Sequence, residues 1–281
     1  MGRVFSWGEI ERKEVPQSKD FGRVCEEIRH ELSRTDAVLG AVLFGSALNE
    51  RFMERSDIDC LLVYDGMERP ALTEVLHQLQ ASARKRHIPL EFIPVDEASA
   101  REGIHTIGPS FAWHLEQAVK THLVIKADPL RFIRLSDSAK SQSARVEDVL
   151  GYLRRKILRF EQGIVELPVM AESEYLHFLR KILELPVHVA RKVLWLSVPN
   201  LSSDSKAHVI RCYPDIVSSP LRGIFQTLLS MDSDYSHEVL VGLHEPDEDR
   251  YIDALKTIAK RAFWAFEFAR ANAIFVLNRF S

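Results

Sequence analysis

The sequence is poor in cysteine, and its three cysteines lie far apart. Their spacing matches no zinc site and their odd number argues against a disulfide framework, so we expect the reducing environment of the cytoplasm. The eleven histidines show no pair with a convincing metal-ligand spacing. The arginine–histidine spacing of a helical ribonuclease motif is also missing. These absences leave zinc proteins, disulfide-stapled domains and nucleases without support.

Long apolar runs are missing as well. No segment approaches the roughly 18 apolar residues needed to span a bilayer, and the first residues lack the pattern of a signal peptide. The most apolar late segment, 262–277, is interrupted by polar and charged residues. The net charge is −3 and there is no strong basic tract, which argues against non-specific coating of nucleic acid. We therefore expect a cytoplasmic protein with no membrane partner.

The composition is that of a globular protein. Hydrophobic residues make up 46% of the 281 residues and charged residues 27%. This length suits one large domain or two ordinary ones. A polar stretch, 136–143, separates a first part of mixed patterns from a second part with almost only helical periodicity. The sequence therefore predicts an α+β protein, with a small mixed-sheet domain at 1–135 and an all-α helical bundle at 144–281.

Periodicity also places the single elements. In the first part it predicts helices at 20–34, 68–86, 97–101 and 109–119, and strands at 41–44, 60–64, 88–95 and 121–126. In the second part it predicts helices at 145–164, 173–197, 205–212, 219–230 and 249–278. Pro186 should kink or split the helix in which it falls.

The segment 43–63 carries the main chemical signal. Gly45 and Ser46 follow an apolar strand, and about ten residues later Asp57 and Asp59 lead into a second one. Aspartates at i and i+2 of a strand point to the same face. Glycine allows a close approach to the backbone, and a helix beginning after Ser46 would offer free N–H groups to a triphosphate. Paired carboxylates suit Mg²⁺, which one or two carboxylates usually hold together with substrate phosphates.

Glu91 is the candidate for a third carboxylate, which would orient a metal near the nucleophile of a two-metal site. It lies between Leu90 and Phe92 in a predicted strand. The alternative is that Glu91 lies on the solvent face of an edge strand, which the neighbouring prolines favour. Asp96 and Glu97 are rival carboxylates, but their pattern is that of a helix cap.

Together these residues resemble the signature of the DNA polymerase beta-like nucleotidyltransferase superfamily. That signature is a hydrophobic residue, Gly, Gly or Ser, about ten residues, Asp, a hydrophobic residue and Asp or Glu, with a later carboxylate between hydrophobic residues. Here it runs through Phe44-Gly45-Ser46, Asp57-Ile58-Asp59-Cys60 and Leu90-Glu91-Phe92. The resemblance covers about residues 20 to 130, and the form Ser56-Asp57-Ile58-Asp59 is most similar to the bacterial minimal and antibiotic-nucleotidyltransferase branch.

The resemblance implies an enzyme that moves a nucleoside monophosphate from an NTP, with ATP expected, to an acceptor hydroxyl and releases pyrophosphate. It implies that Asp57 and Asp59 hold two Mg²⁺ ions, that Glu91 completes the metal site on the nucleophile side, and that Gly45 and Ser46 cradle the triphosphate. In relatives of this design the helical domain packs against the sheet and chooses the acceptor.

The acceptor is the open part of this prediction. We expect a small molecule, because the chain is acidic and lacks a strong basic tract. The alternatives are a tRNA or protein acceptor, as in toxin- or defence-type relatives, and a regulator that binds nucleotide without turnover. A third alternative is an interaction partner in a toxin–antitoxin or defence pair, and an oligomer is compatible with the aromatic surface of the last helix.

Basic residues of the second part do not settle the acceptor. Arg154, Arg155, Lys156 and Arg159 give one helix a positive face, which we interpret as a solvated surface. Lys192 is one of several cations that could bind a γ-phosphate, and no spacing rule selects it.

Overall fold

The computed structural model describes most of the chain, namely residues 16–45, 57–121, 123–134, 141–166, 168–171, 174–175, 178, 181, 185–198, 201–203, 205–234 and 247–280. The described residues fall into two compact units, 16–134 and 141–280, which meet in the chain between Lys140 and Ser141. This division lies inside the polar stretch 136–143. We name the part before it the sheet unit and the part after it the helical unit.

The described residues of the sheet unit form a four-stranded sheet with the strand order β3-β2-β1-β4. Strand β1 (Val38–Phe44) is antiparallel to β2 (Ile58–Tyr64) and to β4 (Val124–Ile125), whereas β2 is parallel to β3 (Leu90–Asp96). Its helices are α1 (Ser18–Arg34), α2 (Arg69–Lys85), α3 (Glu97–Glu102) and α4 (Pro109–Thr121), with 3-10 turns at Gly66–Glu68 and Pro129–Phe132. Together with the helical unit, this mixed sheet confirms the predicted α+β class.

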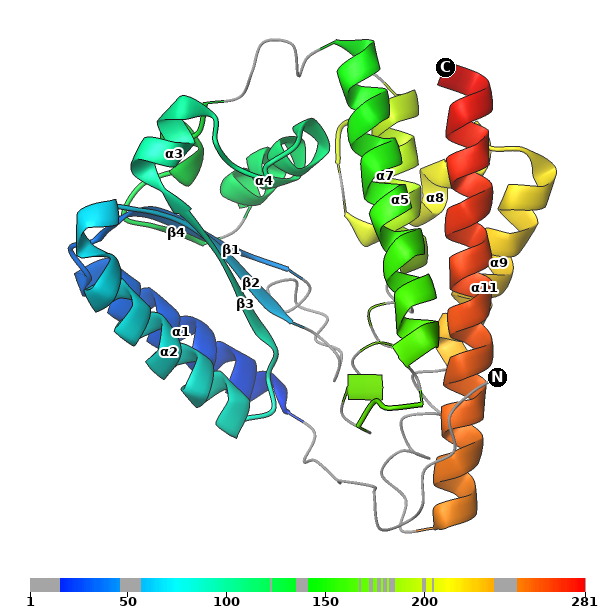
Figure 1. Cartoon of the computed structure of the whole chain (residues 1–281), viewed down its shortest axis with the longest axis horizontal. Helices are drawn as coiled ribbons and strands as arrows, with labels where there is room; N and C mark the ends of the chain where they lie inside the picture. Colours follow the sequence, from blue (N-terminus) through cyan, green and yellow to red (C-terminus); the bar gives the residue numbers. More distant parts are fainter. Residues whose placement is uncertain are drawn as a thin grey trace. The chain divides into compact units, whose positions relative to one another are not determined.

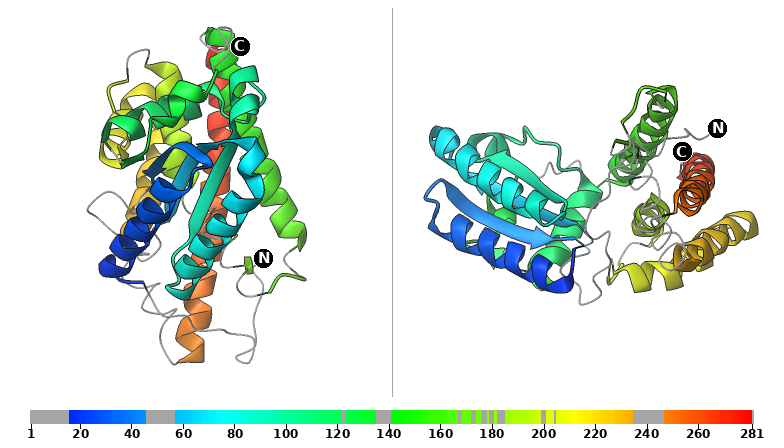
Figure 2. Two further views of the ribbon diagram at one scale, coloured as in Figure 1. Left: turned by 90° about the vertical axis from the view of Figure 1, so that its left-hand side faces the viewer. Right: turned by 90° about the horizontal axis from the view of Figure 1, so that it is seen from below.

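Helices cover both faces of the sheet. Helices α1 and α2 lie side by side on one face, and α3 and α4 lie on the other (Figures 1 and 2). In β2, Cys60 and Leu62 pack with residues of α1 and α2, whereas Leu61 and Val63 pack with residues of α3 and α4. Because successive residues of a strand point to opposite faces, Asp59 lies on the α3 and α4 side.

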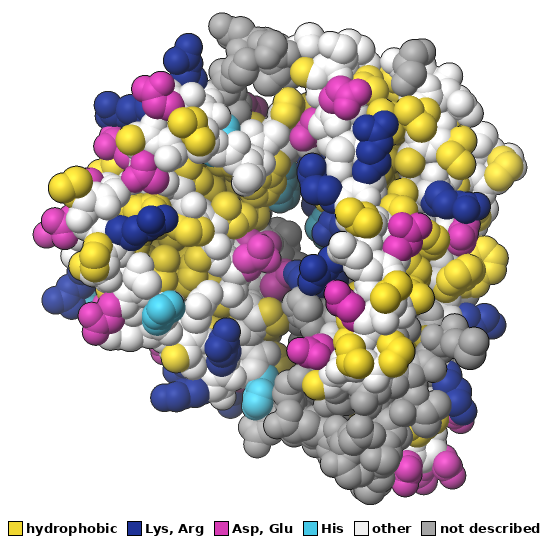
Figure 3. Space-filling model, in the orientation of Figure 1, with side chains coloured by type: hydrophobic (Ala, Val, Ile, Leu, Met, Phe, Trp, Pro, Cys, Tyr) yellow, Lys and Arg dark blue, Asp and Glu magenta, His cyan; other side chains and the backbone are white. Residues whose placement is uncertain are grey.

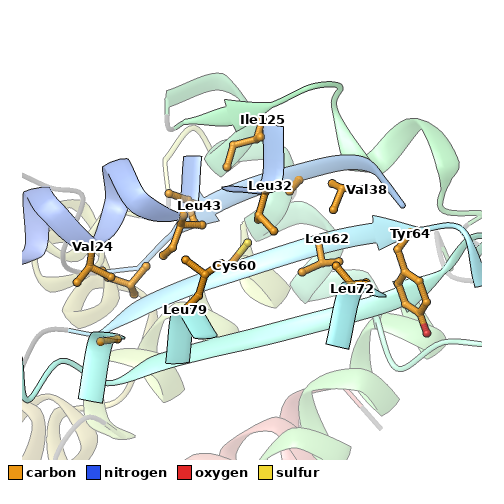
Figure 4. Packing of buried hydrophobic residues seen from close by; sticks show 14 of the residues in the cluster. Val24, Leu32, Val38, Leu43, Cys60, Leu62, Tyr64, Leu72, Leu79 and Ile125 are labelled. Atoms are coloured by element: carbon orange, nitrogen blue, oxygen red, sulfur yellow. The ribbon is translucent and has the colours of Figure 1, made fainter. Parts of the chain in front are cut away.

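Figure 4 shows the apolar layer between the sheet and the helices α1 and α2. Val24 and Leu32 of α1 and Leu79 of α2 belong to one buried cluster with Leu43 and Cys60 of the strands. Each fully buried aliphatic side chain of this kind contributes about 1.5–3 kcal/mol. Burial raises the pKa of the Cys60 thiol, since an apolar layer disfavours the charged thiolate. This layer fixes β1 and β2 from the face opposite Asp59.

Gly40 of β1 lies where a side chain has no room. A Cβ atom there would be 2.5 Å from the carbonyl oxygen of Ala127, a backbone atom that cannot swing away. We expect Gly40→Ala to lower the free energy of unfolding by about 2 kcal/mol. Gly22→Ala on α1 should instead raise it by about 0.5–1 kcal/mol, since alanine favours the helix. Nothing lies within 4 Å of a Cβ atom at Gly22.

Urea unfolding of the two variants checks this expectation. Equal midpoints for Gly40→Ala and Gly22→Ala would contradict the close contact between β1 and Ala127.

The helical unit contains, among its described residues, the helices α5 (Gln142–Glu166), α7 (Leu185–Ser197), α8 (Lys206–Ile216), α9 (Ser219–Asp234) and α11 (Glu248–Phe280). Helix α11 packs against α5, α7 and α9 and so connects these helices into one bundle. It is 33 residues long. Neither α11 nor any other helix in the described ranges combines the length and the apolar character needed to cross a bilayer.

Pro186 belongs to α7, which is described from Leu185 onward. Residues 182–184 lie outside the described part of the chain, so the kink or split expected at Pro186 stays a prediction. Helix α8 continues to Ile216 with Pro214 inside it, whereas the sequence pattern predicted an end at residue 212. The buried Tyr213 donates its hydroxyl to Oδ1 of Asn272 on α11, at 2.7 Å. This tertiary contact holds the last turns of α8 in place despite the proline.

Candidate active site

Asp59 and Glu91 lie side by side on neighbouring strands. Asp59 of β2 is the register partner of Glu91 of the parallel strand β3. Register partners point to the same face of a sheet, on strands about 4.8 Å apart. Asp57 lies immediately before β2, one strand period ahead of Asp59. The sheet therefore brings two of the three predicted carboxylates together and leaves the third next to them in the chain.

Gly45 follows β1 and turns the chain beside these carboxylates. Its φ angle is 107°, in the region that favours glycine. A Cβ atom at this position would lie 3.2 Å from Oδ2 of Asp59 and 3.1 Å from the carbonyl oxygen of Asp57. Glycine thus lets the backbone pass close to Asp59. Ser46, and the short helix expected after it, lie outside the described residues, so their part in a phosphate cradle stays a prediction.

The three carboxylates differ in exposure. Asp57 and Asp59 are half-buried, whereas Glu91 is exposed. Strand β3 is the edge strand of the sheet, as the neighbouring prolines suggested. An edge position does not remove Glu91 from the site, because the register places it beside Asp59. Solvent therefore reaches this end of the sheet at Glu91.

The rival carboxylates have structural partners. Oδ1 of Asp96 accepts a hydrogen bond from the backbone N–H of Ser99 at 2.9 Å and so caps α3. Glu97 accepts a hydrogen bond from Arg101 one turn later at 2.6 Å. Both contacts agree with the helix cap that the sequence pattern favoured.

Aromatic rings border the site on the β1 side, a feature that the sequence pattern did not single out. Phe44 is the register partner of Asp59 on β1. Its ring centroid lies 6.0 Å from that of Phe111 and 5.7 Å from that of His114, both on α4. His114 takes part in this packing, at 6.3 Å between its ring centroid and that of Phe111. The i, i+3 spacing of Phe111 and His114 on a helix is the signal that could have paired them.

The donor set suits Mg²⁺ chemically. Carboxylate oxygens are hard ligands, and one or two of them complete the octahedral shell of Mg²⁺ with waters and substrate phosphates. Within the described ranges, no three His, Cys, Asp or Glu side chains are placed to enclose a metal ion on their own. Asp59 and Glu91, with Asp57 beside them, would therefore hold an ion together with outside oxygen ligands such as those of a triphosphate.

The region around this site matches the model of a known protein family. Residues 25–107 match the family model described as a nucleotidyltransferase domain. The matched region contains Gly45, Asp57, Asp59 and Glu91. The match supports the nucleotidyltransferase superfamily for this region, while the bacterial minimal or antibiotic branch stays a prediction. No curated protein matches the chain.

Proposed function

We propose that the nucleotidyltransferase domain transfers a nucleoside monophosphate from an NTP, with ATP as the expected donor, to an acceptor hydroxyl in a Mg²⁺-dependent reaction. The observation that carries this proposal is the register of Asp59 and Glu91 beside the close turn at Gly45. The family match supports nucleoside monophosphate transfer in general. The metal, the nucleotide and the acceptor are what the proposal adds.

Each residue has a distinct part in the proposed reaction. Bound Mg²⁺ would lower the pKa of the attacking hydroxyl and neutralise charge on the leaving pyrophosphate. Asp57 and Asp59 would hold both ions and, through them, the phosphates, and Glu91 would complete the ion on the side of the acceptor hydroxyl. Because Gly45 has no side chain, the triphosphate can approach the backbone of this turn closely beside Asp59.

The bonds that change follow from these parts. The acceptor oxygen forms a bond to the α-phosphorus, and the bond from that phosphorus to the oxygen bridging to the β-phosphorus breaks. The hydroxyl proton passes to solvent water, and pyrophosphate departs with the bridging oxygen. Because Asp57 and Asp59 are half-buried, their charges are screened less by water than those of fully exposed carboxylates.

We propose a small-molecule hydroxyl as the acceptor. The support is the net charge of −3 and the absence of a strong basic tract in the sequence, since nucleic acid binding depends on phosphate contacts by basic side chains. A tRNA or protein acceptor is the alternative that the same experiment separates.

The test incubates the purified chain with Mg²⁺ and each α-³²P-labelled NTP, in the presence of small-molecule, tRNA and protein fractions of a cell extract. We expect label on a small-molecule fraction, and no label with EDTA or with the Asp57→Ala/Asp59→Ala variant. Label on tRNA or protein would overturn the small-molecule acceptor and still support nucleoside monophosphate transfer. No label on any fraction, with NTP still bound, would overturn the transferase proposal in favour of a nucleotide-binding regulator.

A further inference from the structure

Helix α11 exposes large apolar side chains. Phe263, Ile274 and Leu277 are 56%, 52% and 40% exposed, whereas Phe268 and Val276 of the same helix are fully buried. Figure 3 shows hydrophobic side chains at the surface of the helical unit. Single exposed apolar residues are common, but several on one face of a helix mark an interaction surface. The arrangement of these residues along α11 therefore decides whether they form such a surface.

The exposed apolar residues of α11 belong to one continuous stripe. Seven residues follow one another along it in alternating steps of four and three, namely Lys256, Lys260, Phe263, Glu267, Arg270, Ile274 and Leu277. Six of them are exposed and Glu267 is half-buried. Steps of four and three are the heptad spacing with which one helix packs along another, and here they follow an exposed face. We name these seven residues the α11 stripe.

The order of side chains is symmetric about the pair Glu267 and Arg270. These two residues carry opposite charges, and Phe263 and Ile274 lie four residues beyond them on either side. Nε of Arg270 lies 3.4 Å from Oε2 of Glu267, so the two charges form an ion pair within the helix. A series of apolar, acidic, basic and apolar positions is its own complement when a second helix runs in the opposite direction.

A twofold axis between residues 267 and 270 would use this symmetry. It would bring Glu267 against the partner's Arg270 at two equivalent places. By the same operation, Phe263 would pack against the partner's Ile274. A parallel second copy would instead place Glu267 against Glu267 and Arg270 against Arg270, which like charges disfavour. Charged residues along a heptad seam set the orientation of the partner in this way.

We propose that the α11 stripe is the contact surface of a homodimer and packs antiparallel against the stripe of a second copy of the chain. A second copy requires the symmetric order of charged and apolar residues, whereas an unrelated partner would not. The contact goes beyond the proposed nucleotidyl transfer, because no residue of the stripe belongs to the carboxylate site. It gives the oligomer that the sequence left open a defined surface.

The test measures the mass of the full chain by sedimentation equilibrium over a series of protein concentrations. We expect the wild type to change from monomer to dimer within the series. Glu267→Arg and Arg270→Glu each turn the attractive charge contacts of the antiparallel dimer into repulsive ones. Each should therefore raise the dissociation constant of the dimer at least about tenfold. The double variant Glu267→Arg/Arg270→Glu exchanges the two charges and should dimerise as the wild type does.

Two further samples separate lost contacts from misfolding. A copy with Glu267→Arg carries two arginines at the centre of the stripe, and a copy with Arg270→Glu carries two glutamates. An equimolar mixture should therefore form dimers under conditions in which neither variant dimerises alone. The matched control is Glu74→Arg, which makes the same change of charge at an exposed position of α2 and should leave dimerisation unchanged.

Weakening by the single variants together with recovery in the double variant would establish the antiparallel contact, because a parallel homodimer opposes like charges in every one of these proteins. A wild type that stays monomeric throughout the series would overturn the proposal. Single variants that dimerise as well as the wild type, or a double variant that dimerises no better than the single variants, would overturn it as well.

Discussion

Asp59→Asn is expected to lower nucleotidyl transfer about a thousandfold, which corresponds to about 4 kcal/mol of transition-state stabilisation. The substitution keeps the size of the side chain and removes the charge beside Glu91. The fold should persist, because β2 is held by its pairing with β1 and β3 and by Cys60 and Leu62 on the opposite face. The rate of α-³²P transfer at saturating NTP measures the loss.

Asp65→Asn is the matched control at the other end of the same strand. Oδ1 of Asp65 accepts a hydrogen bond from the backbone N–H of Met67 at 3.0 Å, and asparagine caps as well as aspartate. Transfer and stability should both stay near the wild-type values. Equal transfer rates for Asp59→Asn and Asp65→Asn would exclude Asp59 from the chemistry.

Gly45→Ala is expected to lower transfer about a hundredfold, because displacing a reacting group by about 1 Å can have that effect. The new Cβ atom would start 3.2 Å from Oδ2 of Asp59, so the carboxylate or the turn must move. The positive φ of 107° adds a stability cost of about 1–2 kcal/mol for a residue with a side chain. Transfer rates and urea unfolding measured on the same preparation separate the two effects.

Gly103→Ala controls for the backbone effect. Gly103 also has a positive φ, 75°, but the nearest atom to its Cβ position is the carbonyl oxygen of Arg134 at 3.7 Å. This variant should lose a similar amount of stability and keep its transfer rate. A parallel loss of transfer in Gly45→Ala and Gly103→Ala would assign the effect to stability rather than to the geometry beside Asp59.

Local patterns predicted most of the sheet unit. Strand alternation predicted that Asp57 and Asp59 share one face, and the structure has the next residue, Cys60, buried against α1 and α2 on the opposite face. The register of Glu91 could not be predicted in this way. Pairing between two parallel strands depends on the intervening helix α2 and its packing. The sequence therefore could not decide whether Glu91 is a site residue or a solvent-exposed residue of an edge strand.

In the helical unit, too, the sequence could not predict which charged side chains of different helices meet. The sequence revealed a basic run on one helix and Lys192 on another, but no spacing links side chains on different helices. Lys156 of that run and Lys192 both lie beside the ring of Tyr152, and this depends on how α5 and α7 pack. The predicted end of α8 at residue 212 was wrong for a similar reason. The contact between Tyr213 and Asn272 that accompanies the longer helix is tertiary and has no signal in the local sequence.

The most direct test of the central claim compares ATP labelled at the α-phosphate with ATP labelled at the γ-phosphate, in the presence of the acceptor fraction and Mg²⁺. Nucleotidyl transfer by the carboxylate site predicts α-label on the acceptor and γ-label in free pyrophosphate, both lost in EDTA and in Asp59→Asn. Label from the γ-phosphate on the acceptor or in inorganic phosphate, with none in pyrophosphate, would contradict it.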